Sequence, residues 1–182
     1  MLRNIVMALL IFIVFIIQTC FKQEITIGDV APNLMLALIC CIGFIYGKKP
    51  GMYCGLAAGL LIDLFYGYGG VIGLTAILLM NLGYVIGLFN EIFYSDDICI
   101  PVLLIVVSDL IYNFLYYCIT FLLRGDLNLA SYFQIIMFPE MIYTGFVSVF
   151  LYWFIKFLSV KIEKFEKRGE DKLVKGNFEK FD

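Results

Sequence analysis

Three acidic residues stand inside long apolar stretches of this sequence, and their chemistry most needs an explanation. Asp63, Asp109 and Glu140 all have mainly hydrophobic neighbours in the chain. Carboxyl groups in such surroundings can act as a general acid and base or carry a proton. The sequence has no histidine, which removes the commonest general base and a common metal ligand.

These acidic residues do not indicate a catalytic site. An intramembrane aspartyl protease needs two aspartates facing each other at one depth, whereas Asp63 and Asp109 are expected at different depths and lack the flanking G-x-G-D signature. A serine hydrolase needs a base for its nucleophile. The six cysteines form no C-x-x-C pair, and no nucleotide-binding spacing is present. We therefore expect no catalytic residue, no cofactor, no metal site and no nucleic-acid partner.

Several explanations remain open for acids in an apolar setting. They can be protonated and bonded to Asn81, Asn113 or tyrosines, line a water-filled pocket, or meet polar groups of a partner; a proton pathway is the least favoured. Asp109 and Asn113 lie four residues apart and so share one helix face. Asn81, with Gly83 and Gly87, predicts an inward face of its own segment.

A stripe of small residues leads to the first of the acids. Gly51, Gly55, Gly59 and Asp63 recur every four residues and so form one narrow stripe on a helix. Small residues let a second helix approach closely inside a membrane, and a carboxylate cannot comfortably face lipid. The stripe therefore predicts either packing within the chain, which is favoured, or an interface with a partner.

The elements that position these residues are predicted from composition. The chain has 182 residues, 63% hydrophobic and 15% charged, with a mean hydropathy of +0.97, whereas soluble domains are about 45–50% apolar and about 25% charged. The sequence therefore predicts an all-α integral membrane protein with about six transmembrane helices in one bundle. The predicted spans are residues 4–21, 31–47, 51–66, 74–94, 98–123 and 133–158.

Two of these spans could be arranged differently, and the span at residues 4–21 resembles a signal sequence. Residues 31–47 and 51–66 could form a re-entrant hairpin, but Lys48 and Lys49 lie between them. A charge at the bilayer centre costs at least about 2.5–3.5 kcal/mol, so that turn is expected at an aqueous surface. The first span lacks an A-x-A-like cleavage site and is expected to be retained.

Orientation follows from the distribution of cations. With a cytoplasmic N-terminus and six spans, only Lys22 and Arg124 of the 13 Lys and Arg residues lie outside. We therefore expect a multi-pass protein of the bacterial cytoplasmic (inner) membrane with both termini in the cytoplasm. Residues 1–158 are expected to form the bundle, and residues 159–182 a basic cytoplasmic tail. That tail is predicted to be amphipathic at its start and then disordered, although a merely solvated tail is the alternative.

The order of these features resembles the MreD family over nearly the whole span to about residue 158. Pro32 and Asn33 open the second span, and a basic turn precedes the glycine and aspartate stripe. A late helix then carries Pro139 and Glu140, and the chain ends in a basic tail. The most specific piece is Pro32-Asn33 combined with the stripe.

The resemblance implies a function. MreD-like proteins are non-enzymatic membrane scaffolds of the cell-wall elongation machinery that maintains rod shape. They associate with the MreC-like bitopic membrane protein and, through it, with MreB filaments, a RodA-type glycan polymerase and a penicillin-binding transpeptidase. Their fold is similar to the six-helix substrate-binding subunits of energy-coupling-factor transporters.

That similarity leaves an alternative of another class. The chain could be the substrate-capture subunit of a small-molecule, vitamin-type transporter, with Asp63 and Glu140 lining an outer pocket. The predicted outer loops are short and poor in ligand-binding groups, so the scaffold is favoured.

Overall fold

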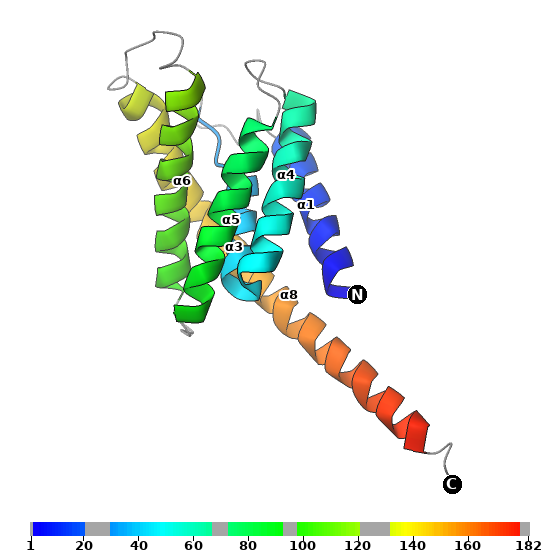
Figure 1. The fold of residues 1–182 in the computed structure, drawn as a ribbon. Helices are drawn as coiled ribbons and strands as arrows, with labels where there is room; N and C mark the ends of the chain where they lie inside the picture. Colours follow the sequence, from blue (N-terminus) through cyan, green and yellow to red (C-terminus); the bar gives the residue numbers. More distant parts are fainter. Residues whose placement is uncertain (1, 21–29, 67–72, 93–97, 121–131, 179–182) are drawn as a thin grey trace.

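The computed structural model describes residues 2–20, 30–66, 73–92, 98–120 and 132–178, which form an all-helical bundle (Figure 1). Successive helices run in opposite directions, and the two chain termini lie at the same end. The elements are α1 (Leu2–Cys20), α3 (Leu34–Tyr46), α4 (Lys48–Tyr66), α5 (Leu74–Ile92), α6 (Cys99–Thr120), the π-helical turn η3 (Phe133–Met137) and α8 (Phe138–Phe178).

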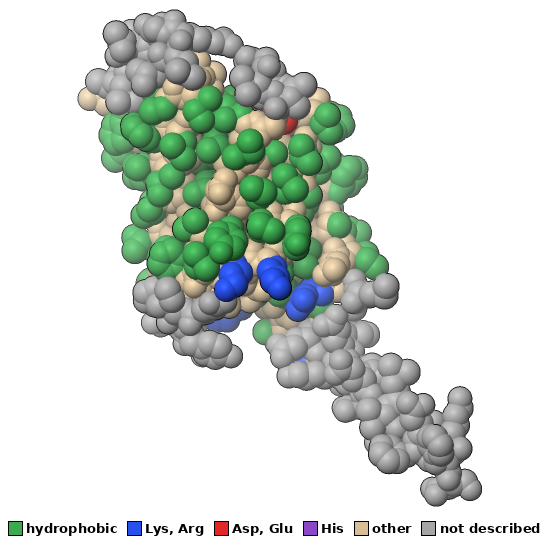
Figure 2. Space-filling model, viewed as in Figure 1, with side chains coloured by type: hydrophobic (Ala, Val, Ile, Leu, Met, Phe, Trp, Pro, Cys, Tyr) green, Lys and Arg blue, Asp and Glu red, His purple; other side chains and the backbone are tan. Residues whose placement is uncertain are grey.

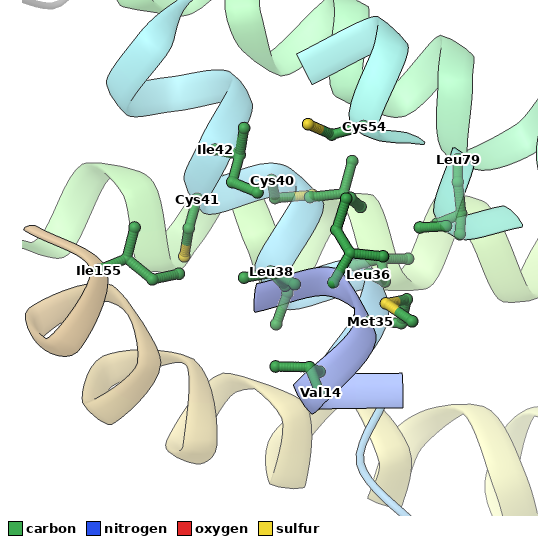
Figure 3. Packing of buried hydrophobic residues seen from close by; sticks show 14 of the residues in the cluster. Val14, Met35, Leu36, Leu38, Cys40, Cys41, Ile42, Cys54, Leu79 and Ile155 are labelled. Carbon is green, nitrogen blue, oxygen red and sulfur yellow. The ribbon is translucent and has the colours of Figure 1, made fainter. Parts of the chain in front are cut away.

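Helix α3 lies at the centre of the bundle. It contacts α1, α4, α5, α6 and α8, and its residues from Met35 to Phe44 are all buried. A helix that is hydrophobic on every side is stable only when it is covered on every side. Figure 3 shows its side chains between Val14 of α1, Leu79 of α5 and Ile155 of α8.

The central helix is also short. Its 13 residues span roughly 20 Å at 1.5 Å per residue, less than the roughly 30 Å of a hydrocarbon core. Because Lys48 and Lys49 follow the C-terminal end of α3 directly, the N-terminal end falls short of the opposite surface, and its backbone groups need partners from the protein.

The outer surface of the bundle is a belt of apolar side chains, with Lys and Arg gathered at the end where the termini lie (Figure 2). Phe146 is 70% exposed and Phe150 is 71% exposed on α8. Among the described residues, Arg3–Cys20, Cys99–Thr120 and Phe133–Ile162 are long and apolar enough to cross a membrane. Shorter apolar helices cover Leu34–Tyr46 and Leu74–Asn90.

Each predicted span overlaps a helix, and the described ends differ from the predicted ones by up to three residues, except at the end of α8. Helix α4 begins at Lys48 rather than at residue 51, because proline is tolerated in a first helical turn and Pro50 stands there. Helix α8 continues to Phe178, beyond the end predicted at residue 158. Between α3 and α4, Gly47 has a φ of 91°, a left-handed conformation that glycine adopts without strain.

Candidate functional site

Asp63 binds the beginning of the next helix. Its side chain is only 7% exposed, and its Oδ2 accepts hydrogen bonds from the backbone N–H groups of Gly73 at 2.9 Å and Ala76 at 3.1 Å. The first amides of a helix have no partner within the helix, and negative charge is favourable there. The Asp63 side chain on α4 therefore caps the N-terminal end of α5.

The glycine stripe that leads to Asp63 faces the same neighbour. A Cβ atom added to Gly51 would collide with the carbonyl oxygen of Gly83, and one added to Gly83 would collide with that of Gly51. Gly55 and Gly59 meet the backbone of α5 in the same way. This face is therefore occupied by α5 of the same chain, and only residues without a side chain permit so close an approach.

The N-terminus of α3 is held by its own N-cap and by two other helices. The Asn33 side chain accepts a hydrogen bond from the N–H of Leu36 at 3.2 Å, as an N-cap does. The N–H of Asn33 donates to Thr144 Oγ1 on α8 at 3.0 Å. The N–H of Met35 donates to Gln18 Oε1 on α1 at 3.0 Å. Amides buried in the bundle thus obtain the partners that water supplies elsewhere.

The C-terminus of α3 is held by α5. Asn90 Nδ2 donates to the carbonyl oxygens of Phe44 and Ile45, and the N–H of Gly47 donates to the Gly43 carbonyl at 2.8 Å. Pro32 is buried just before the opposite end. The Pro32-Asn33 pair therefore starts a helix whose two ends are bound by α1, α5 and α8.

Asp109 has quite different surroundings. It lies midway along α6 and is completely buried, and within the described residues neither carboxyl oxygen has a hydrogen-bond partner. The Thr144 hydroxyl of α8 is the polar side chain placed to interact with it, although their geometry falls short of a hydrogen bond. Cys40 of α3 also lies within electrostatic range. A carboxyl group enclosed in this way lowers stability unless it is compensated.

Within the described residues the two asparagines bond to backbone carbonyls and not to the acids, so the explanation that pairs them with the acids is not observed. Asn113 Nδ2 donates to the backbone carbonyl of Asp109 at 3.2 Å, and Asn81 Nδ2 donates to that of Ile77 at 2.8 Å. Each amide side chain thus bonds to the backbone one turn earlier in its own helix, as short polar side chains often do inside a helix.

The prediction that Asn81 lies on an inward face is wrong. Asn81 is exposed on α5, whereas Gly83 and Gly87 are buried against α3 and α4. Two residues along a helix are about 200° apart around its axis. Asn81 therefore points away from the side on which both glycines pack.

A cluster of polar side chains lies at the end of the bundle opposite the termini. The Tyr112 hydroxyl of α6 interacts with the Thr75 side chain and lies within electrostatic range of Asp63 and Glu140. Glu140 is also within range of Tyr132. The structure thus brings Asp63 and Glu140 to one tyrosine, whereas Asp109 stands apart from them along α6.

Pro139 changes the helix geometry without ending the helix. Residues Phe133–Met137 form a π-helical turn, and the N–H of Phe138 bonds to the Phe133 carbonyl five residues back. Proline has no N–H to donate, and single π-helical turns are frequent at functional sites. Glu140 then lies in the first turn of α8.

One model of a known protein family matches this chain. The family model of the rod shape-determining protein MreD matches residues 1–161. The chain belongs to the MreD family. No curated protein and no solved structure matches it.

The matched part covers α1 to α6 and the part of α8 that packs in the bundle, so it includes every capping residue described above. MreD-family proteins are membrane proteins of cell-shape determination rather than an enzyme family. This chain is therefore a membrane protein with a role in rod shape determination.

Proposed function

We propose that this MreD-family chain is a non-enzymatic scaffold of the bacterial cell-wall elongation machinery. It maintains rod shape by associating with an MreC-like bitopic membrane protein and, through it, with MreB filaments, a RodA-type glycan polymerase and a penicillin-binding transpeptidase. The observation that carries the proposal is the family match over residues 1–161, which spans the whole bundle.

The use of the polar residues supports a structural role. Asp63 caps α5, and Asn33, Thr144 and Asn90 bind the ends of α3. These side chains form hydrogen bonds with the backbone at helix ends and so hold the helices in position, which stabilises the bundle. A scaffold needs a stable bundle, whereas an enzyme needs polar groups that are free to meet a substrate.

The proposed topology has six spans in the inner membrane with both termini in the cytoplasm. Two observations support it: the termini and the α3–α4 turn lie at one end of the bundle (Figure 1), and Lys and Arg gather at that end (Figure 2). Cations concentrate on the cytoplasmic side of membrane proteins.

Thiol labelling of intact cells tests this topology. In a variant with the six native cysteines replaced by alanine, a cysteine at Lys49 is expected to react with an impermeant maleimide only after the cells are permeabilised. A cysteine at Arg124 serves as the control and is expected to react in intact cells. Labelling of position 49 in intact cells would contradict the proposed orientation.

Affinity purification in mild detergent from native membranes tests the scaffold function. Recovery of an MreC-like protein with wall-synthesis enzymes is expected, and an unrelated tagged membrane protein of similar size controls for non-specific capture. Recovery of a transport subunit with paired ATPases would instead favour the substrate-capture alternative. In that case the Asp63, Tyr112 and Glu140 group would be the place to seek a ligand.

A further inference from the structure

A groove separates parts of α1 and α4 on the outer surface of the bundle. It encloses about 580 Å³, within the range of cavities that hold small ligands. Its walls are mostly apolar and include Met7, Ala8 and Ile11 of α1 with Cys54 and Ala57 of α4. The small side chains of Ala8 and Ala57 leave space that larger residues would fill.

One end of this groove is positively charged. Arg3 and Lys49 are exposed and line the groove together with Pro50 at the first turn of α4. The Arg3 guanidinium lies over the Tyr46 ring, 5.7 Å from its centre, which positions it beside the groove. The beginning of α4 adds the partial positive charge of a helix N-terminus at the same place.

We propose that the groove binds an anionic phospholipid, with one acyl chain along the apolar walls and the phosphate between Arg3 and Lys49. Arg3 and Lys49 are the second residues of α1 and α4, and Lys and Arg side chains gather at this end of the apolar belt (Figure 2), which is the expected depth of lipid headgroups. An apolar wall that ends in two cations complements a molecule with a hydrocarbon chain and an anionic head.

The size of the groove favours a lipid over the helix of another protein. A transmembrane helix is about 30 Å long and about 10 Å across with its side chains, which makes it several times larger than a space of about 580 Å³. An acyl chain is narrow enough to lie between α1 and α4 while leaving their contact in place.

Native mass spectrometry of the purified full-length chain tests the proposal. Dioleoyl-phosphatidylglycerol and dioleoyl-phosphatidylcholine are added separately at equal concentrations, and the fraction of protein retaining one lipid is measured. Phosphatidylglycerol is expected to bind more tightly. Each cation is expected to contribute roughly fivefold, so that R3Q/K49Q together weaken phosphatidylglycerol binding about 25-fold and leave phosphatidylcholine binding unchanged.

Two further variants serve as controls. Lys161→Gln removes an exposed cation of α8 outside the groove and is expected to bind phosphatidylglycerol as the original chain does. R3K/K49R keeps both charges and is expected to retain the phosphatidylglycerol binding that R3Q/K49Q loses. Equal retention of phosphatidylglycerol and phosphatidylcholine by the original chain would overturn the proposal. So would a loss of phosphatidylglycerol binding in Lys161→Gln as large as the loss in R3Q/K49Q.

Photo-crosslinking identifies the occupant in native membranes. A benzophenone amino acid at Tyr53, which is 63% exposed and lines the groove, is expected to give an adduct with the mass of an anionic phospholipid. The same probe at Phe150 on α8 reports ordinary lipid contact, because Phe150 lies outside the groove. A protein adduct at position 53 in place of the lipid adduct would show that a partner helix occupies the surface and would refute the lipid site.

Discussion

Two aspartates in apolar helices of this bundle have opposite surroundings. Asp63, where α4 meets α5, accepts two backbone hydrogen bonds and completes the start of a helix. Asp109, where α6 faces α3 and α8, is fully buried, and neither of its oxygens has a hydrogen-bond partner in the described part. The position of an acid in a hydrophobic segment therefore does not reveal its energetic role. One carboxyl group bonds the start of a helix, whereas the other makes no hydrogen bond that would offset its burial.

The same contrast extends to the neighbouring helices. On the side of α4 and α5, glycines bring backbones into contact, and Gly51 and Gly83 would each collide with the other if either gained a Cβ atom. On the side of α6 and α8, a π-helical turn precedes Pro139. The first side packs backbone against backbone, whereas the second contains Asp109, whose carboxyl oxygens have no hydrogen-bond partner among the described residues.

The largest effect is expected for Gly59→Leu. Its side chain would enter the backbone of α5 at Ala76, so α4 and α5 would have to separate. The loss is expected to exceed about 4–5 kcal/mol, the upper end for single substitutions, and is measured as the yield of monodisperse protein in mild detergent. Val85→Leu is the control, because Val85 is 44% exposed on α5 and lies outside the groove. Normal yield and stability of Gly59→Leu would contradict the close packing.

Asp63→Ala is expected to have the next largest effect. It leaves the amides of Gly73 and Ala76 without their acceptor, at about 1–3 kcal/mol for each buried unpaired group. The midpoint of unfolding by SDS in mixed micelles measures the loss. Asp63→Asn keeps one acceptor oxygen and is expected to lose less than half as much, while membrane insertion stays intact. Equal losses for the two variants would mean that charge, rather than the cap, is what Asp63 contributes.

Thr144→Val tests the long-range cap of α3. Valine has nearly the same shape but cannot accept the hydrogen bond from the Asn33 amide, so a loss of about 1–3 kcal/mol is expected in the same unfolding assay. Thr19→Val on the exposed side of α1 controls for the change of residue type and is expected to be nearly neutral. A neutral Thr144→Val would show that the Asn33 amide has another partner.

Asp109→Asn is expected to change stability least, within about 0.5 kcal/mol or in the stabilising direction. It removes no hydrogen bond made by the carboxyl group within the described residues, and an amide is easier to bury than a carboxylate. The measurement is the same unfolding midpoint, compared directly with that of Asp63→Asn. If the Asp109 variant were the less stable of the two, the contrast between the aspartates would be wrong.

The helices were predictable from the sequence because apolar length is a strong signal in a membrane protein. The span predicted at 4–21 corresponds to Leu2–Cys20, and that at 98–123 covers Cys99–Thr120. The four-residue recurrence of glycine predicted a close-packed face, because periodicity reveals which residues share a face. It could not reveal that α5 covers this face, since pairing between helices depends on the whole bundle.

The caps supplied across the bundle were not predictable. Gln18, Thr144 and Asn90 are polar residues of apolar helices, and no spacing links them to the ends of α3. Asn81 was assigned to the wrong face because neighbouring glycines were assumed to share its direction, although residues two apart point to opposite sides of a helix. Only coordinates show which orphan amide each isolated polar side chain reaches.

The bond between the Asn33 amide and Thr144 has a consequence for biogenesis. The two residues are 111 positions apart, so the ribosome must still make more than half of the chain after α3 enters the membrane. Until α8 is inserted, the beginning of α3 lacks one of its acceptors. The last helix thus closes a bundle begun by the first ones, and the native core is completed only once synthesis has passed that distant threonine.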